Sequence, residues 1–451
     1  MSSSEEGSNV IRLGAPITRR AALKAGLAVA GGGVLAACGI GETSSNPTAS
    51  KQNFSGVTIN VACNPTSIGP ATVGGQQWGA KTGATVNAKL VPYAERALDF
   101  ANAIVSQDPH YDLFFASKDF VAKFSDRLYV NLSGLKLDLS DFFPSTLPQL
   151  SRTGKLYALP LFADQELFIY NKSDFGAAGA DPNNPPSTWD ELYKLAPKLS
   201  TGTREACVTT FQTEPLFWLC YYNSTGAPFL GQDGMQVLFD NQHGLDTWKS
   251  LEAGFKAKWY GPAGFYSVGD ADTALLFNQN LGAAQIGLVE WWSEAVSGDV
   301  KNFNATISKS DVGVTMVPGI AAGTHGSVIV TEGWGISKFS KQQDAALAFL
   351  QYMTGPDFQK QLNLGQVQGG LLATSRVSVA KDPAVSASFP IGPILAQQSK
   401  IQEQWPGVPY PLGPIFTEAC TNLFKGTWDA QMAHDQTVKA TKAAIAKYLS
   451  S

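Results

Sequence analysis

Early in the chain, short strand patterns alternate with helical patterns, and this order restricts the fold class more than any other feature. VTINVAC (57–63) and ATVNAKLV (84–91) alternate and are rich in β-branched residues, as strands are. YDLFFAS (111–117) has a continuously apolar centre, typical of a strand covered on both faces. Helical spacing is found in AERALDFANAIV (94–105), and after a turn-rich stretch we expect another helix around 76–81. Strand, helix, strand, helix, strand predicts an α/β unit with a largely parallel sheet.

Further along, the chain continues to mix strands and helices. A helix is predicted in PPSTWDELYKLAPKL (185–199), where Ser187 or Thr188 can act as the N-cap. A pair of helices is predicted in residues 340–362, broken at Gly355-Pro356. The chain ends in an amphipathic helical pattern.

The first 38 residues have the pattern of an export signal. The uncharged apolar run from Ala25 to Ala37 is 13 residues long, whereas a membrane-spanning helix needs about 20. Arg19 and Arg20 precede it and resemble a twin-arginine signal. The run ends in LAAC, which resembles a bacterial lipobox, so we expect Cys38 to be lipidated and to become the first residue of the mature protein. The alternative is an ordinary cleaved signal in which Cys38 is incidental.

The length and net charge of the chain further restrict its domain organisation and its class of partner. Removing residues 1–37 leaves 414 residues, too many for one ordinary core, which predicts two lobes. The whole chain has 33 Lys and Arg against 37 Asp and Glu, and the mature part has a net charge of −6. This balance gives no indication of a nucleic-acid partner, which would require a basic face.

The cysteines and histidines form no recognisable metal or haem pattern, so we expect no metal site and no cofactor. An exported protein can form disulfides, and the four cysteines after Cys38 could pair or remain buried free thiols. They are Cys63, Cys207, Cys220 and Cys420.

Taken in order, three segments resemble the extracellular solute-binding proteins of ABC importers, of the maltose-binding type. They are YALPLFADQELFIYNKSDF, PSTWDELYKLAPKL and EGWGISKFSKQQDAALAFLQYMTGPDFQKQL. The resemblance implies two α/β lobes joined by a hinge around a cleft, with crossings near 160–164, near 329–333 and after Arg376. The expected domains are a signal at 1–37, a flexible tether at 38–56, an N-terminal lobe of 57–162 plus 333–378, and a C-terminal lobe of 163–332 plus 379–451.

The same resemblance implies a binding protein rather than an enzyme. It would be a lipid-anchored, extracytoplasmic monomer that captures a sugar by hinge closure and delivers it to the permease subunits of the importer. A sugar site needs carboxylates and amides for the hydroxyl groups and aromatic rings for the C–H faces.

Several residues match ligand-binding positions of the family. The resemblance gives this role to Asp164 at the first hinge crossing, to an acidic-aromatic element, and to a tryptophan platform. The last two comprise Glu214, Phe217, Trp218, Trp291 and Trp292. A surface turn, a helix start or the core would explain the same residues without a ligand.

Other candidates lie where strands of a parallel sheet end, which is where ligands bind in open α/β sheets. These are Asn64, Thr66, Ser117, Lys118 and Asp119. The resemblance adds candidates near the second crossing and late in the chain, namely Glu332, Trp334, Trp405 and Tyr410. Solvated loops or hinge bracing are the alternatives.

Two other functions remain open. A polyamine-binding protein would share the two-lobed plan and would also use carboxylates and aromatic rings. A secreted glycan-active enzyme could use paired carboxylates such as Asp164 and Glu214, although the chain has no Gly-x-Ser-x-Gly elbow.

Overall fold

The structure is a computed structural model of the chain. It describes residues 53–212, 216–231, 233–267, 270–288, 295, 306–367, 373–388, 391–398 and 407–450. The expected signal and almost all of the expected tether lie outside these residues.

One mixed sheet with the strand order β2-β1-β3-β10-β6-β8-β7 organises the described chain, and β9 pairs with β6 off this path. Strands β1, β2 and β3 run parallel, as the sequence predicts, whereas β10 is antiparallel to β3 and to β6. The strands are β1 (Thr58–Cys63), β2 (Thr85–Leu90), β3 (Leu113–Ser117), β6 (Leu159–Asn171), β7 (Glu205–Cys207), β8 (Gly282–Leu288), β9 (Val312–Thr315) and β10 (Ile329–Ile336). A separate hairpin joins β4 (Ser151–Arg152) and β5 (Lys155–Leu156).

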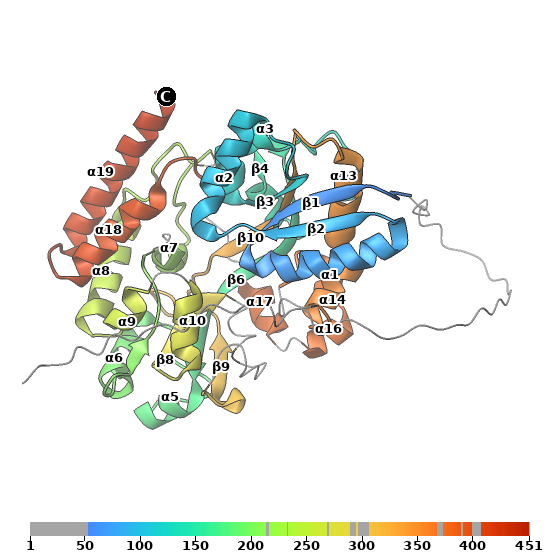
Figure 1. The fold of residues 1–451 in the computed structure, drawn as a ribbon. Helices are drawn as coiled ribbons and strands as arrows, with labels where there is room; N and C mark the ends of the chain where they lie inside the picture. Colours follow the sequence, from blue (N-terminus) through green and yellow to red (C-terminus); the bar gives the residue numbers. More distant parts are fainter. Residues whose placement is uncertain are drawn as a thin grey trace, which may run out of the picture. The chain divides into compact units, whose positions relative to one another are not determined.

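Helix α1 lies beside the strands β1 and β2 and contacts α13, whereas α8, α18 and α19 group together elsewhere (Figure 1). The helices of the first group and its surroundings are α1 (Pro65–Thr82), α2 (Tyr93–Ser106), α3 (Lys118–Leu128), α4 (Thr146–Gln149), α13 (Gln343–Met353) and α14 (Pro356–Asn363). The others are α5 (Lys172–Ala178), α6 (Trp189–Leu199), α7 (Leu216–Asn223), α8 (Gln242–Lys256), α9 (Pro262–Phe265), α10 (Asp270–Asn278), α15 (Val377–Ala380), α16 (Pro383–Ser388), α17 (Gly392–Gln398), α18 (Leu412–Phe424) and α19 (Ala430–Leu449).

Helix α1 begins eleven residues earlier than the expected start at Gln76. The segment resembles a turn because it is rich in Pro, Gly and Ser, but each type has a helical role here. Asn64 and Ser67 form a capping box, and Pro65 occupies the first helical position, where its missing N–H is not needed. Gly75 allows close packing, because a Cβ there would lie 2.7 Å from Val86 in β2.

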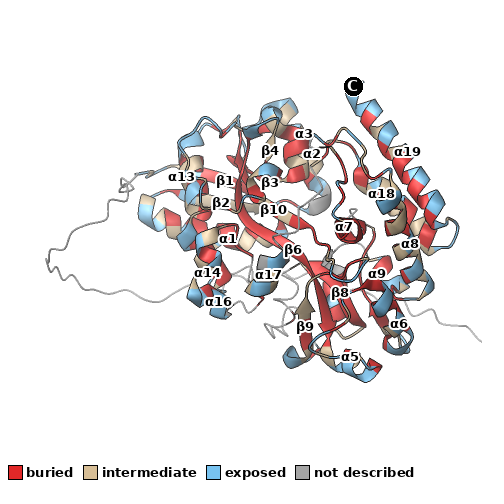
Figure 2. Ribbon diagram, turned by 180° about the vertical axis from the view of Figure 1, so that it is seen from behind, coloured by how far each residue is buried: buried red, intermediate tan, exposed pale blue. Residues whose placement is uncertain are grey.

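Two large hydrophobic clusters share the sheet. The first contains β1, β3 and the start of β6 together with Phe349 and Leu350 of α13. The second contains Phe168 and Tyr170 from the later part of β6 and extends to Ile445 in α19. All thirteen residues of β6 are buried, so this one strand contributes to both clusters (Figure 2).

The chain passes between the halves of the sheet along two paired strands and one further segment of the described residues. Strand β6 pairs with β10 up to Gln165 and with β8 from Glu166 onward. The third segment is 373–376: Ala373 packs in a small cluster with the later part of β6, while Arg376 bridges to Phe142. We call β6, β10 and 373–376 the crossing segments.

Aromatic side chains dominate the second cluster. Trp218 in α7 is 1% exposed and stacks on Tyr222, with ring centres 5.0 Å apart. It also contacts the rings of Trp248 and Phe416. Trp218 therefore holds α7, α8 and α18 together.

The cysteine alternatives are resolved in favour of thiols. All four cysteines among the described residues are free and buried. Burial raises the pKa of Cys207 to about 12, so this thiol stays protonated at neutral pH.

Truncation of Trp218 tests its place in the core. Trp218→Ala is expected to lower the free energy of unfolding by about 3–5 kcal/mol, because it leaves a large cavity among packed rings. Chemical denaturation measures the change. Leu98→Ala, at a side chain that is 66% exposed, is the control and should change stability by less than about 0.5 kcal/mol. A small effect of Trp218→Ala would contradict the core assignment.

Candidate functional site

Polar side chains meet where β1 and β3 end. Asn64 follows β1 and is 3% exposed; its Nδ2 donates to Oε2 of Glu332 at 2.9 Å. Its Oδ1 accepts from the Ser67 N–H at 2.8 Å, so the cap of α1 fixes the orientation of the amide. Glu332 in β10 is the register partner of Ser117, the last residue of β3. The structure thus brings three predicted residues together at one edge.

The first turn of α3 adds opposite charges to this edge. Lys118 is 6% exposed, and Asp119 lies beside it. Burial raises the pKa of Asp119 above that of an ordinary carboxyl, while the charge of Lys118 and a hydrogen bond from the Val408 N–H act in the opposite direction. That N–H lies 3.4 Å from Oδ1 of Asp119.

A late segment of the chain therefore contacts α3. Val408 and Tyr410 belong to the second cluster, and the Tyr410 hydroxyl donates to the Gly234 carbonyl at 2.6 Å. At Gly407, a Cβ would lie 2.3 Å from the Lys118 carbonyl oxygen. Residues 407–408 thus link the second cluster to the start of α3, and the close approach requires glycine.

Asp164 lies on the same face of the sheet as Glu332. It is fully buried in β6 opposite Val330, and Val330 and Glu332 are two residues apart on β10. Side chains two apart on a strand share a face, so the two carboxylates are diagonal neighbours on the paired crossing strands. The Oδ1 atom of Asp164 accepts from the Gln165 N–H at 2.9 Å.

Sequence reasoning missed Arg96, which lies beside this edge. The residue is fully buried in α2, and its guanidinium carbon lies 4.7 Å from the ring centre of Phe115 in β3. Phe115 is two residues before Ser117, so both side chains share a face of the strand. A buried guanidinium over an aromatic face is a cation–π contact. The only signal in the sequence is an arginine in a strongly amphipathic helix, which by itself indicates a surface position.

The structure does not gather every predicted residue at this edge. Phe217 and Trp218 pack in the second cluster, and Trp334 is fully buried with its Nε1 donating to the Ala62 carbonyl at 3.1 Å. Tyr410 is 6% exposed, and Thr66 is half-buried in the first turn of α1. Four predicted residues lie outside the described residues, namely Glu214, Trp291, Trp292 and Trp405.

Aromatic residues in the core and on a ligand platform have the same sequence signature. Trp218, for example, is 1% exposed, and its ring partners among the described residues include Tyr222, Trp248 and Phe416 of the core. Within the described ranges, no group of three or more His, Cys, Asp or Glu could hold a metal ion.

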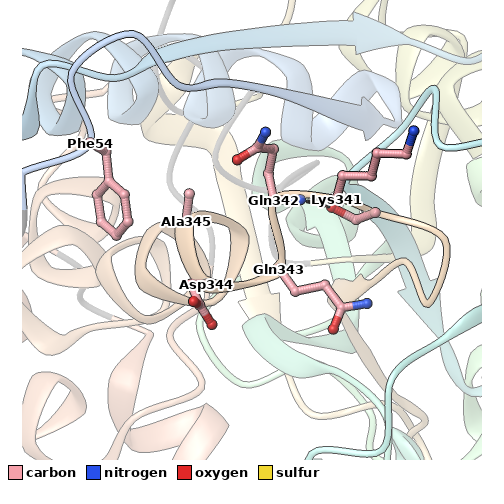
Figure 3. Close-up of a pocket in the computed structure, with 7 residues that line it drawn as sticks. Phe54, Lys341, Gln342, Gln343, Asp344 and Ala345 are labelled. Carbon is pink, nitrogen blue, oxygen red and sulfur yellow. Dashed lines mark hydrogen bonds between the residues drawn. The ribbon is translucent and has the colours of Figure 1, made fainter.

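A cavity of about 410 Å³ lies away from this edge, beside Phe54 and the start of α13 (Figure 3). One lining residue, Ser340, donates to Asp112, which immediately precedes β3. Ser117 ends the same strand, so the cavity and the polar edge lie at opposite ends of β3. The cavity is lined mainly by exposed polar residues around the N-terminus of one helix.

Comparison with known proteins assigns the family. Residues 70–360 match the model of the bacterial extracellular solute-binding proteins. The chain belongs to this family. A probable amino-acid ABC transporter periplasmic-binding protein of Sinorhizobium fredii is 28% identical over 57% of the chain and 56% of its own length. The sn-glycerol-3-phosphate-binding periplasmic protein UgpB of Brucella abortus is 32% identical over 18% of the chain and 20% of its length. The chain thus spans about half or less of the length of these relatives.

Solved structures share the fold of this solute-binding protein. The GacH receptor of Streptomyces glaucescens, described with acarbose, has a TM-score of 0.74 and 20% identity, covering 87% of this chain and 99% of its own. A solute-binding protein of Thermotoga lettingae bound with α-D-tagatose also has a TM-score of 0.74, with 19% identity and coverage of 86% and 100%. These similarities confirm the predicted two-lobed α/β fold of the periplasmic-binding-protein type.

The polar edge of this solute-binding protein combines complementary groups. Carboxylates can accept hydrogen bonds from hydroxyl or ammonium groups, and the ammonium group of a lysine such as Lys118 can donate to oxygen atoms. In the described part of the chain, every helix is too short or too polar to span a bilayer.

Substitution of Gly407 tests the contact between residues 407–408 and α3. Gly407→Ala is expected to separate the two segments, because the new Cβ would overlap the Lys118 carbonyl. Hydrogen exchange should then become faster at the Val408 amide and in the first turn of α3. Gly134→Ala is the control, since a Cβ at Gly134 meets nothing within 4 Å. Unchanged exchange in a folded Gly407→Ala protein would refute the contact.

Proposed function

We propose that the chain is an extracytoplasmic solute-binding protein of an ABC importer that captures a sugar by closure of two lobes. The observation that carries this proposal is the polar edge itself. Asn64, Lys118 and Asp119 follow the carboxyl ends of the parallel strands β1 and β3. Glu332 lies on a crossing segment, opposite Ser117 at the end of β3. A ligand at this edge would contact residues that move with the hinge.

The chemistry of the edge favours a polyhydroxylated ligand. Carboxylates at Asp119, Asp164 and Glu332 would accept from several hydroxyl groups, and the Asn64 amide would orient them. Proteins of the same fold were described with acarbose and with α-D-tagatose. Together these support a mono- to oligosaccharide as the solute.

A phosphorylated polyol is the second candidate. Two cationic side chains, Arg96 and Lys118, are buried near the edge, and cations recognise phosphate oxygens. One relative over part of the chain is named for sn-glycerol-3-phosphate. A polyamine is less favoured, because the same cations would repel it.

The lobes are proposed to divide as 57–162 plus 333–378 and 163–332 plus 379–451. In support, β6 changes its pairing partner from β10 to β8 between Gln165 and Glu166. We further propose export by the twin-arginine route, anchoring by acyl chains on Cys38, and delivery of the ligand by a monomer to permease subunits. Several acyl chains would hold the protein firmly at the membrane.

A thermal-shift screen of the full chain with Cys38→Ser tests the function. The panel contains maltose, maltotriose, tagatose, ribitol, glycerol 3-phosphate, spermidine and amino acids. A ligand at 100 times its dissociation constant adds about 2.7 kcal/mol to stability, so a true ligand should raise the Tm clearly. We expect a saccharide to give the largest shift.

The other outcomes discriminate between the alternatives. A shift with glycerol 3-phosphate alone would replace the sugar by a phosphorylated polyol, and a shift with spermidine alone would overturn both. Saccharide recovered intact after long incubation agrees with a binding protein, whereas its cleavage would indicate an enzyme. A silent panel would contradict the proposed sugar.

A further inference from the structure

One buried amide connects two crossing segments. Gln359 in α14 is fully buried, and its Oε1 accepts from the Thr374 hydroxyl at 2.5 Å and from the Ser375 N–H at 3.0 Å. Its Nε2 donates to Oγ of Ser375 at 2.7 Å and to the carbonyl of Pro160 at 3.3 Å. Pro160 lies in β6, and Thr374 and Ser375 lie in the segment 373–376.

The two segments also bond directly beside this amide. The Ser375 hydroxyl donates to the Pro160 carbonyl at 3.0 Å, so Gln359, Ser375 and Pro160 form a closed set of hydrogen bonds. Helix α14 is itself anchored in the first cluster through Phe358 and Leu362. The side chain of Gln359 therefore holds both crossing segments in a fixed position relative to α14.

Only an amide satisfies all of these partners. The oxygen of Gln359 faces two donors, and its nitrogen faces three acceptors, the third being the Thr354 carbonyl at 3.4 Å. Asn and Gln alone among side chains combine an acceptor oxygen with a donor nitrogen in this way without a change of protonation. A carboxylate would keep the contacts to Thr374 and the Ser375 N–H but would place an acceptor against the Pro160 carbonyl. A leucine at position 359 would lose all of these side-chain hydrogen bonds.

We propose that Gln359 is a positioning residue that fixes where β6 and the segment 373–376 bend, and so sets the affinity for the solute. This inference rests on the proposed function, in which the crossing segments flex as the lobes close. Apparent affinity falls with the fraction of molecules in the closure-competent arrangement. Without the Gln359 amide, the crossing segments adopt more conformations, and a smaller fraction of the molecules can close around the solute.

The test compares Gln359→Glu with Gln361→Glu in the same helix. Gln361 accepts from the amide of Gln77 in α1 and donates to the Asp357 carbonyl within α14, so its hydrogen bonds make it a matched control away from the crossing segments. Donor and acceptor fluorophores are attached at Val105→Cys in α2 and Met432→Cys in α19, which are 85% and 45% exposed. The background is the full chain with Cys38→Ser, and the four described cysteines are buried and should not react.

We expect Gln359→Glu to broaden the distribution of distances between the labels without ligand, and to weaken binding of the saccharide found in the screen about tenfold. Gln361→Glu should leave both unchanged. An unchanged distance distribution in folded Gln359→Glu would overturn the proposal. The distance measurement needs no ligand, so it tests the hinge even where no saccharide binds, and failure of the function is thereby separated from failure of this inference.

A second, milder variant provides the test if Gln359→Glu folds poorly. Ser375→Ala removes the hydroxyl that bonds both Gln359 and Pro160 and leaves a small side chain. It should broaden the distance distribution in the same direction. An unbroadened distribution in this variant would also overturn the proposal.

Discussion

The pairing of β6 with two different partners is the constraint on which the rest of the structure depends. Its first half is bonded to β10 and its second half to β8 and β9, and every residue of the strand is buried. A buried strand must have its backbone N–H and C=O groups bonded, so the two clusters cannot separate without breaking this ladder. In the proposed closure of the lobes, motion between the clusters would therefore be a bending of the crossing segments.

The pairing of β6 also determines where the residues of the polar edge lie. Asp164 and Glu332 lie on the paired crossing strands, whereas Asn64 and Lys118 lie at strand ends of the first half. The segment at Gly407 brings the second cluster against α3 from another direction. The raised pKa of Asp119 indicates that burial removes this carboxyl group from water, which a charged group tolerates only with polar or charged partners.

Local patterns allowed most of the fold to be predicted, and contacts distant in sequence account for what was missed. The helix break at Gly355-Pro356 and the parallel strands follow from turn residues and apolar spacing. The early start of α1 was missed because Pro and Gly indicate turns unless the packing against Val86 is known. Burial of Trp218, Arg96 and Gln359 depends on rings or carbonyls from other elements, and no local pattern reports it.

Small-angle X-ray scattering of the full chain, with and without saturating saccharide, tests the central claim most directly. Closure of two lobes about bending crossing segments predicts a smaller radius of gyration in the presence of the ligand, with no loss of secondary structure by circular dichroism. Saccharide binding seen by calorimetry together with an unchanged radius of gyration would contradict hinge closure as the mechanism of capture.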